Sequence, residues 1–386
     1  MMNLGSGRKP VEDLNEYERY QAHQHHHNKA HNFRFEAVLL VLIFSVVSLS
    51  SLVLYNWAGY IGISPNPLGR KHFPNEASSS EAPAAIPVDA SQTTKEGEDE
   101  LEKMLKKAAS IDRTVIITTL NAAWTSPNSV FDLFLESFRI GNQTLHLLDH
   151  LLVVAFDQTA YSRCMEVHSY CYALHTNGAN FTGEAQFMSS KYLEMMWARI
   201  DFLRHVLEKG YNFVFTDTDI MWLRNPFSHF HPHSEFQIAC DVFNSNSSDL
   251  NNKPNGGFNY VKSSRRTVQF YKFWYSSKDL YPGSHDQDVL NNIKFHPFIA
   301  ELGLQLTFLP TVFYSGFCQL SDDLNLVITV HANCCVGLEK KIRDLGLVLD
   351  VWREYISDVK RRVSRPLSWG LLPQYCWERN ISPAPM

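Results

Sequence analysis

The sequence predicts an α/β domain built on a largely parallel sheet, and three observations support this fold class. Two mostly apolar runs, residues 115–120 and 151–156, are typical of strands buried on both faces. Residues 129–140 between them place apolar side chains at helical spacing. A longer helical pattern, residues 187–207, leads through Gly210 into a third strand at residues 213–215. This alternation favours a sheet of mostly parallel strands lying between helices.

A single membrane-spanning helix is predicted ahead of that domain, at residues 37–57. Of the 19 residues from 37 to 55, 13 are Val, Leu, Ile or Phe and none is charged. Those apolar residues favour membrane insertion by about 4–8 kcal/mol. A cleaved signal peptide is the alternative, but more than 30 residues precede the run and no clear small-x-small cleavage site follows. We therefore interpret residues 1–36 as a cytosolic and disordered tail, and residues 37–57 as a signal anchor.

The charge distribution around this anchor predicts a lumenal or extracellular position for the rest of the chain. Five Lys or Arg residues precede the span, and the first cations after it are at positions 70 and 71. Four N-glycosylation sequons and all seven cysteines lie on the far side, in a compartment that permits disulfides. The odd number of cysteines leaves at least one unpaired within the chain, and the pairing is not deducible from sequence. The sequons begin at Asn142, Asn180, Asn246 and Asn380.

Composition separates a stem from the folded domain. Residues 58–110 are rich in Pro, Ser, Ala and charged residues, which bury too little apolar surface to fold, although residues 100–109 can form a short helix. Residues 111–386 are rich in aliphatic and aromatic side chains and form the predicted catalytic domain. The net charge of −5 and the isoelectric point near 6.4 give no reason to expect binding to nucleic acid.

Asp217 and Asp219 are the most informative residues of this domain. They directly follow the apolar strand at residues 213–215, and only Thr218 separates them. In an extended backbone, residues two apart share one side of the chain. Adjacent carboxylates repel one another unless a cation neutralises them, and oxygen ligands suit Mn²⁺ or Mg²⁺. Because ligands of α/β sheets gather at the carboxyl ends of strands, we predict a metal–diphosphate site here.

Four further patches could complete such a site. Gly256 and Gly257 precede a predicted strand, where glycine permits close approach of a ligand or simply makes a turn. The polar residues 285–288 open an apolar helical run, which one of the aspartates could cap. His331 follows a strand at residues 327–330, and imidazole is a common metal ligand. Arg199 lies on the helix before Asp217, where it suits a diphosphate, sugar hydroxyls or an ion pair.

The ordered motifs of this region resemble a known family. They are FTDTDIMWLRNPF around Asp217, QIACD at residues 237–241, PNGGFNYV around Gly256, HDQDVLN at residues 285–291 and HANCC from His331. Together they resemble the plant nucleotide-diphospho-sugar transferases of glycosyltransferase family 77, over residues 118–352. The resemblance implies a GT-A fold, a type II Golgi membrane protein, and an Asp-x-Asp motif that holds Mn²⁺ and a nucleotide sugar. It also implies transfer with retention of anomeric configuration.

A more distant similarity, to the retaining galactosyltransferases and glycogenin-type enzymes of family 8, implies individual roles. On that basis Asp217, Asp219 and His331 bind the metal, and Asp217 also contacts the nucleotide. The nucleotide sugar is further held by Arg199, Asn255, Gly256, Gly257 and Asp286. Gln287 or Asp288 faces the anomeric carbon. The residues after His331 depart from the family 8 pattern, and Gly256 replaces an alanine of its Asn-Ala-Gly turn.

We therefore expect a type II membrane glycosyltransferase that moves a pentose or galactose from a UDP-sugar to a cell-wall polysaccharide or glycoprotein. Mn²⁺, or Mg²⁺ in its place, is the expected cofactor. Front-face attack is preferred, and double displacement through Asp288 is the alternative. Two other functions remain open. A membrane-anchored sugar-binding protein of the same fold would lack turnover. A phosphatase of the haloacid dehalogenase type also uses Asp-x-Asp, but the motif of these enzymes has Thr or Val at the position of Met221.

Overall fold

The computed structural model describes one α/β unit of the chain. The described residues are 100–174, 181, 183, 185–361, 369–370 and 372–377. The predicted tail, the anchor at residues 37–57, and Asn180 and Asn380 lie outside them. Within the described part of the chain, no helix combines the length and the apolar character that crossing a membrane requires.

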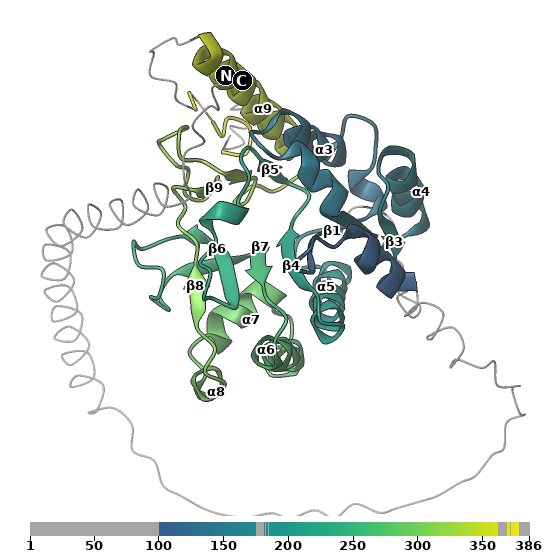
Figure 1. Ribbon diagram of the computed structural model, residues 1–386, viewed down its shortest axis with the longest axis vertical. Helices are drawn as coiled ribbons and strands as arrows, with labels where there is room; N and C mark the ends of the chain where they lie inside the picture. The colour runs from purple at the N-terminus through teal and green to yellow at the C-terminus, as the bar shows by residue number, and fades with distance from the viewer. Residues whose placement is uncertain are drawn as a thin grey trace, which may run out of the picture. The chain divides into compact units, whose positions relative to one another are not determined.

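A seven-stranded sheet forms the centre of this unit, in the order β3-β2-β1-β4-β7-β6-β8 (Figure 1). Neighbouring strands run parallel except on the two sides of β7, which is antiparallel to β4 and β6. The predicted α/β class with a mostly parallel sheet is therefore confirmed. The strands are β1 (Thr114–Leu120), β2 (Leu151–Ala155), β3 (Cys171–Ala173), β4 (Asn212–Thr216), β6 (Phe236–Val242), β7 (Lys253–Val261) and β8 (Leu306–Phe308).

A second, three-stranded sheet lies beside the carboxyl end of β4. Its order is β5-β10-β9, with β5 at Ile220–Trp222, β9 at Tyr314–Gly316 and β10 at Thr329–His331. β5 follows β4 after three residues, whereas β10 comes from more than a hundred residues later in the chain. This small sheet therefore brings the C-terminal part of the domain to the end of β4.

Helices cover both sheets. On one face of the large sheet, α5 packs against α6, and α7 packs against β7 (Figure 1). α9 packs on α3 and contacts β5. The α-helices are α3 (Val130–Ile140), α4 (Gln158–Val167), α5 (Ser190–Glu208), α6 (Arg265–Ser276), α7 (Asp286–Ile293), α8 (Pro297–Glu301) and α9 (Leu338–Arg361). Short 3₁₀ turns are η1 (Ala122–Trp124), η2 (Leu145–His150), η3 (Phe227–His229) and η4 (Ser277–Asp279).

The core explains why these segments adopt their structures. Phe213 and Phe215 of β4 are fully buried on the side where the aromatic face of α6, including Phe270 and Trp274, also packs. Full burial of such side chains contributes about 1.5–3 kcal/mol each. Residues 100–108 are helical, and Leu105 belongs to the same core. The folded unit therefore includes residues that precede the boundary expected at residue 111.

Three disulfides cross-link the unit, one at its β3 edge and two in its second half. They join Cys164 to Cys171, Cys318 to Cys334, and Cys335 to Cys376. Cys240 is free and buried, so it is the cysteine that the odd count left unpaired. Two of these bonds lie immediately after β10, and they restrain the segment that follows His331.

Candidate active site

Asp217 and Asp219 lie in a tight turn between β4 and β5. The backbone carbonyl of Asp217 accepts a hydrogen bond from the Ile220 amide at 3.2 Å. The Thr218 hydroxyl between the two acids donates to the carbonyl oxygen of Thr119 in β1 at 2.9 Å. The backbone does not stay extended here, because the chain turns at once to start β5. This turn, and not an extended strand, brings the two carboxylates together.

His331 reaches these carboxylates through the small sheet. It pairs with Ile220 in the antiparallel register of β10 and β5, and the next amide, that of Ala332, donates to the Asp219 carbonyl at 3.1 Å. Its Nε2 lies 3.3 Å from Asp219 Oδ1. His331 is the last residue of β10, whereas the sequence analysis placed it just after a strand. Ligand atoms of Asp217, Asp219 and His331 all lie within 4.8 Å of one another.

This donor set fits a divalent cation. Two carboxylates and one imidazole provide the hard oxygen and nitrogen ligands that suit Mn²⁺, with Mg²⁺ as a second candidate. Gly257 lines the same space. A Cβ at Gly257 would lie 2.6 Å from Asp217 Oδ2 and 2.7 Å from His331 Cε1. Only glycine therefore lets β7 approach Asp217 and His331 so closely.

Arg199 of α5 connects two acidic residues across the site. Its guanidinium lies 2.8 Å from Asp217 Oδ1 and 2.5 Å from Asp286 Oδ2, and its side chain is only 5 % exposed. Burial raises the pKa of Asp217, an effect that Arg199 opposes and Asp219 reinforces. Burial acts on Asp286 in the same direction, but Arg199 and His285 outweigh it and lower the pKa of Asp286. Arg199 thus opposes the effect of burial on both carboxylates and holds them in place through its two ion pairs.

Lys341 of α9 is a cation that the sequence analysis did not identify. Its Nζ lies 2.5 Å from Asp219 Oδ2. Burial alone would raise the pKa of Asp219, but Lys341 and His331 lower it well below its usual range. The sequence feature that could have pointed to Lys341 is its position in the first turn of an amphipathic helix, ten residues after a candidate metal-binding histidine. Only the packing of α9 on β5 shows that this lysine points into the site.

The glycine patch and the α7 patch also join the site. Gly256 and Gly257 lie inside β7 rather than before it, and the Gly257 carbonyl accepts the Asp217 amide at 2.7 Å. Asp286 begins α7, and the imidazole of His285, instead of an aspartate, caps that helix. Gln287 Oε1 accepts the Gly256 amide at 3.0 Å. Asn255 and Gly256 follow each other on β7, so the predicted sugar-binding residues are contiguous with the metal group.

Asp288 differs from Asp286 in its surroundings, although both were predicted as site residues. Its carboxylate lies 3.3 Å from His285 Nε2, and its side chain is 53 % exposed. Asp288 lies two residues beyond Asp286 in α7. Residues two apart do not share a face of a helix, so the two side chains point to different sides of α7. The residues brought together are Arg199, Asp217, Asp219, Asn255, Gly256, Gly257, Asp286, Gln287 and His331.

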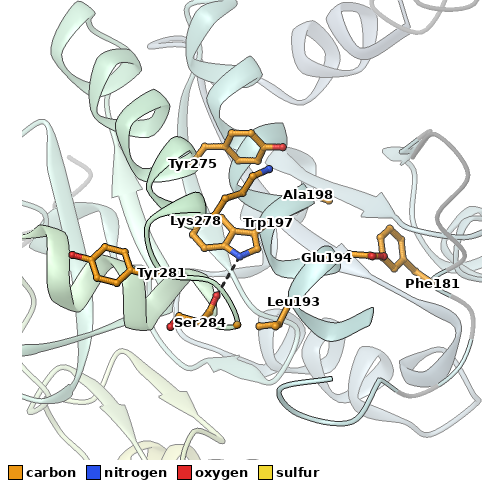
Figure 2. A pocket seen from close by; sticks show the side chains of 10 residues that line it. Phe181, Leu193, Glu194, Trp197, Ala198, Tyr275, Lys278, Tyr281 and Ser284 are labelled. Atoms are coloured by element: carbon orange, nitrogen blue, oxygen red, sulfur yellow. Dashed lines mark hydrogen bonds between the residues drawn. The ribbon is translucent and has the colours of Figure 1, made fainter. Parts of the chain in front are cut away.

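A cavity of about 430 Å³ lies next to this site and not at it. Figure 2 shows Trp197 in the wall of this cavity, where its Nε1 donates to the Ser284 carbonyl at 3.3 Å. Tyr275 and Tyr281 form other parts of the wall. None of the residues predicted to bind metal or sugar lines this cavity.

Asn142 and Asn246, the two sequon asparagines in the described part of the chain, are exposed.

Substituting the two glycines separately tests the close approach of β7. We expect Gly257→Ala to lower affinity for Mn²⁺ by at least about tenfold, since its Cβ would displace Asp217 or His331. At Gly256 a Cβ would lie 3.3 Å from Asp286 Oδ2, a contact that small shifts can relieve. Gly256→Ala is therefore the matched control and should keep most of the affinity. Mn²⁺ titration of both variants measures the difference, and equal losses would contradict the assignment.

Comparison with known proteins agrees with this geometry. Residues 146–345 match the model of the nucleotide-diphospho-sugar transferase family. The chain belongs to this family. An uncharacterized protein of Arabidopsis thaliana is 48 % identical over 297 residues, which cover 75 % of this chain and 78 % of that protein. A UDP-galactose:fucoside alpha-3-galactosyltransferase of Dictyostelium discoideum is 39 % identical over 180 residues, which cover 40 % of this chain and 26 % of that protein.

Solved structures of glycosyltransferases align with this nucleotide-diphospho-sugar transferase at low sequence identity. The apo form of mouse xyloside xylosyltransferase 1 covers 57 % of this chain and 98 % of its own, with 12 % identity and a TM-score of 0.37. A glycosyltransferase involved in glycosylation of the major capsid of PBCV-1 covers 60 % and 98 %, with 10 % identity and a TM-score of 0.35. The family model and the plant relative confirm the predicted nucleotide-diphospho-sugar transferase family, and the assignment to glycosyltransferase family 77 stays a prediction.

Proposed function

We propose that this nucleotide-diphospho-sugar transferase moves a pentose or galactose from a UDP-sugar to a cell-wall polysaccharide or glycoprotein. The observation that carries the proposal is the convergence of Asp217, Asp219 and His331 within 4.8 Å at the end of β4. Two cations, Arg199 and Lys341, flank these ligands. A site with this charge pattern suits a diphosphate leaving group better than a neutral glycan alone.

The side chains divide into two groups by what they would hold. Asp217, Asp219 and His331 would hold Mn²⁺ or Mg²⁺, which supplies Lewis-acid stabilisation of the departing diphosphate when bound. Lys341 adds positive charge on the Asp219 side, where it would neutralise the same leaving group. Asp286 would accept hydrogen bonds from sugar hydroxyls, and the Asn255 amide would donate to them or accept from them. Gln287 would present its amide toward the anomeric carbon.

Front-face transfer with retention is the mechanism we propose for this site. The bond from the anomeric carbon to the phosphate oxygen breaks, the acceptor oxygen bonds to the same face, and the acceptor proton passes to the leaving phosphate. Double displacement would need a carboxylate nucleophile, and its candidate, Asp288, lies against His285 and is half exposed. This placement supports the front-face route. A glycosyl adduct trapped on Asp288 would reverse that choice.

The sequence also supports a narrower family assignment and a cellular location for this protein. We propose a GT-A type fold of glycosyltransferase family 77, carried by a type II Golgi membrane protein. In this arrangement residues 37–57 are the anchor and the stem follows it. The lumenal catalytic domain comprises residues 111–386 together with residues 100–110, which were predicted as the end of the stem. The support is the resemblance of the ordered motifs, the distribution of Lys and Arg around the apolar run, and the disulfides of the described domain.

Removing the metal provides the direct test of this function. The full-length protein is incubated with a panel of UDP-sugars, and release of UDP is measured with and without acceptor glycans. We expect turnover with Mn²⁺, its loss after chelation with EDTA, and its recovery when Mn²⁺ is added back. Binding of a UDP-sugar without any UDP release would favour a sugar-binding protein. Release of phosphate from phosphate monoesters would favour the phosphatase.

A further inference from the structure

Asp241 accepts hydrogen bonds from three side-chain amides next to the proposed site. Asn255 Nδ2 lies 2.7 Å and Asn333 Nδ2 lies 2.8 Å from Asp241 Oδ1, and Gln287 Nε2 lies 2.8 Å from its Oδ2. An ionised carboxylate only accepts, and an amide nitrogen only donates. The charge of Asp241 therefore fixes which end of each amide points toward it.

The orientation of two of these amides is transmitted to the backbone of β7. With their nitrogens on Asp241, the oxygens of Gln287 and Asn255 face the other way. Gln287 Oε1 accepts the Gly256 amide at 3.0 Å, and Asn255 Oδ1 accepts the Gly257 amide at 2.8 Å. A flipped amide would present a donor to a donor, which leaves both unsatisfied. One carboxylate thus sets two amides and, through them, two consecutive glycines.

The third amide extends the same network to the strand that carries the metal-binding histidine. Asn333 lies two residues after His331, and its Oδ1 accepts the Cys318 amide at 3.0 Å. Cys318 is bonded to Cys334, so the disulfide encloses Asn333. Asp241 therefore links three segments that are distant in sequence: β7, the start of α7 and the segment after β10.

Resting on the function proposed above, we propose that Asp241 is a positioning residue of sugar transfer. It holds the amides of Gln287 and Asn255 in the single orientation that presents them to the sugar, and it acts through them. Partners that orient the primary groups of a site typically contribute 10- to 100-fold to activity or affinity, on the order of magnitude known for metal sites. The sequence motif ending at Asp241 was singled out only as part of a resemblance, with no role for this residue.

The first test is a double-mutant cycle in the full-length protein. Asp241→Asn should lower kcat about 10- to 100-fold, with a smaller change in KM for the UDP-sugar, because binding of the nucleotide is left intact. In a Gln287→Ala background the same change should cost much less, since one amide that it orients is already gone. Equal losses in both backgrounds would show that Asp241 acts on the substrate itself and would overturn the proposal.

A matched control separates positioning from general stability. Asp249 also accepts from a side-chain amide, Asn244 Nδ2 at 2.6 Å, in the loop after β6. Asp249→Asn should therefore leave kcat unchanged. If Asp241→Asn lowers the melting temperature but keeps kcat, its role is only structural and the proposal is wrong.

A spectroscopic measurement distinguishes failure of this inference from failure of the proposed function. In protein labelled with ¹⁵N-glutamine, the Nε2 protons of Gln287 should exchange faster with solvent in Asp241→Asn than in the wild type or in Asp249→Asn. Unchanged exchange would overturn the positioning role whether or not the protein turns over a UDP-sugar. Absence of turnover in the wild type, with altered exchange in the variant, would instead contradict the proposed function alone.

Discussion

Asp219→Asn should reduce sugar transfer by about 100- to 1000-fold, the scale on which preorganised charge at a reacting group contributes. The substitution keeps the shape of the side chain but removes its charge. His331 Nε2, at 3.3 Å, and Lys341 Nζ, at 2.5 Å, both face this carboxylate. Loss of one of the two carboxylate ligands should weaken Mn²⁺ binding and leave the diphosphate charge uncompensated. Measurement of kcat and of Mn²⁺ affinity in the same preparation checks both effects.

The stability of this variant should fall, so activity is compared at a temperature where the variant is still folded. Lys341 and His331 lower the pKa of Asp219 in the folded protein, which means that its charged form stabilises the fold, and Lys341 loses its partner in the variant. Thermal unfolding of Asp219→Asn should therefore occur at a lower temperature than that of the wild type. Full transfer activity in a variant with weakened metal binding would exclude the metal role. Full activity with unchanged metal binding would exclude Asp219 as a ligand.

Arg199→Met should lower the free energy of unfolding by about 3–5 kcal/mol, because it leaves buried carboxylates without their partner. Asp286 is only 1 % exposed at its side chain, and Arg199 Nη2 lies 2.5 Å from it. Activity should fall as well, since Asp217 and Asp286 lose their common restraint. Chemical denaturation gives the stability change. The control is Arg204→Met on the same helix, whose ion pairs with Asp201 and Glu208 are more exposed and contribute at most about 1 kcal/mol.

The stability difference caused by Arg199→Met should also depend on pH. Arg199 and His285 depress the pKa of Asp286 in the folded protein against the effect of burial. A depressed pKa stabilises the fold above the unfolded value of about 3.9, and this stabilisation is lost as pH falls through the folded value. The gap between wild type and Arg199→Met should therefore be full at neutral pH and narrow below about pH 4. A gap that is independent of pH would show that lost packing, and not charge, causes the destabilisation.

Much of the fold followed from local patterns. The strands at residues 115–120, 151–156 and 213–215 and the helices at residues 129–140 and 187–207 all correspond to observed elements, because hydrophobic periodicity reflects burial directly. The small sheet was harder to predict from the sequence. Its strands are three residues each, and their pairing joins β5 to β10 across more than a hundred residues, which periodicity does not report.

The site shows the same division. Asp217, Asp219 and His331 were predicted from residue types and a resemblance, and Gly256, Gly257, Asp286 and Gln287 joined them as expected. Lys341 and Asp241 were missed as site residues. Neither has a distinctive local context, since one is a lysine on an amphipathic helix and the other an acid at the end of a strand. Asp288 was predicted alongside its neighbours; its carboxylate lies 3.3 Å from His285 Nε2 and its side chain is 53 % exposed.

The sequence alone determined that this chain carries an α/β domain with an acidic motif at a strand end and the ordered motifs of a nucleotide-diphospho-sugar transferase. Those features depend on local composition and order, which the chain states directly. The tertiary structure decided which charges meet. The antiparallel pairing of β10 with β5 places His331 on Asp219, and the packing of α9 adds Lys341. Contacts of this kind arise from burial of distant segments against one another, and no short stretch of sequence encodes them.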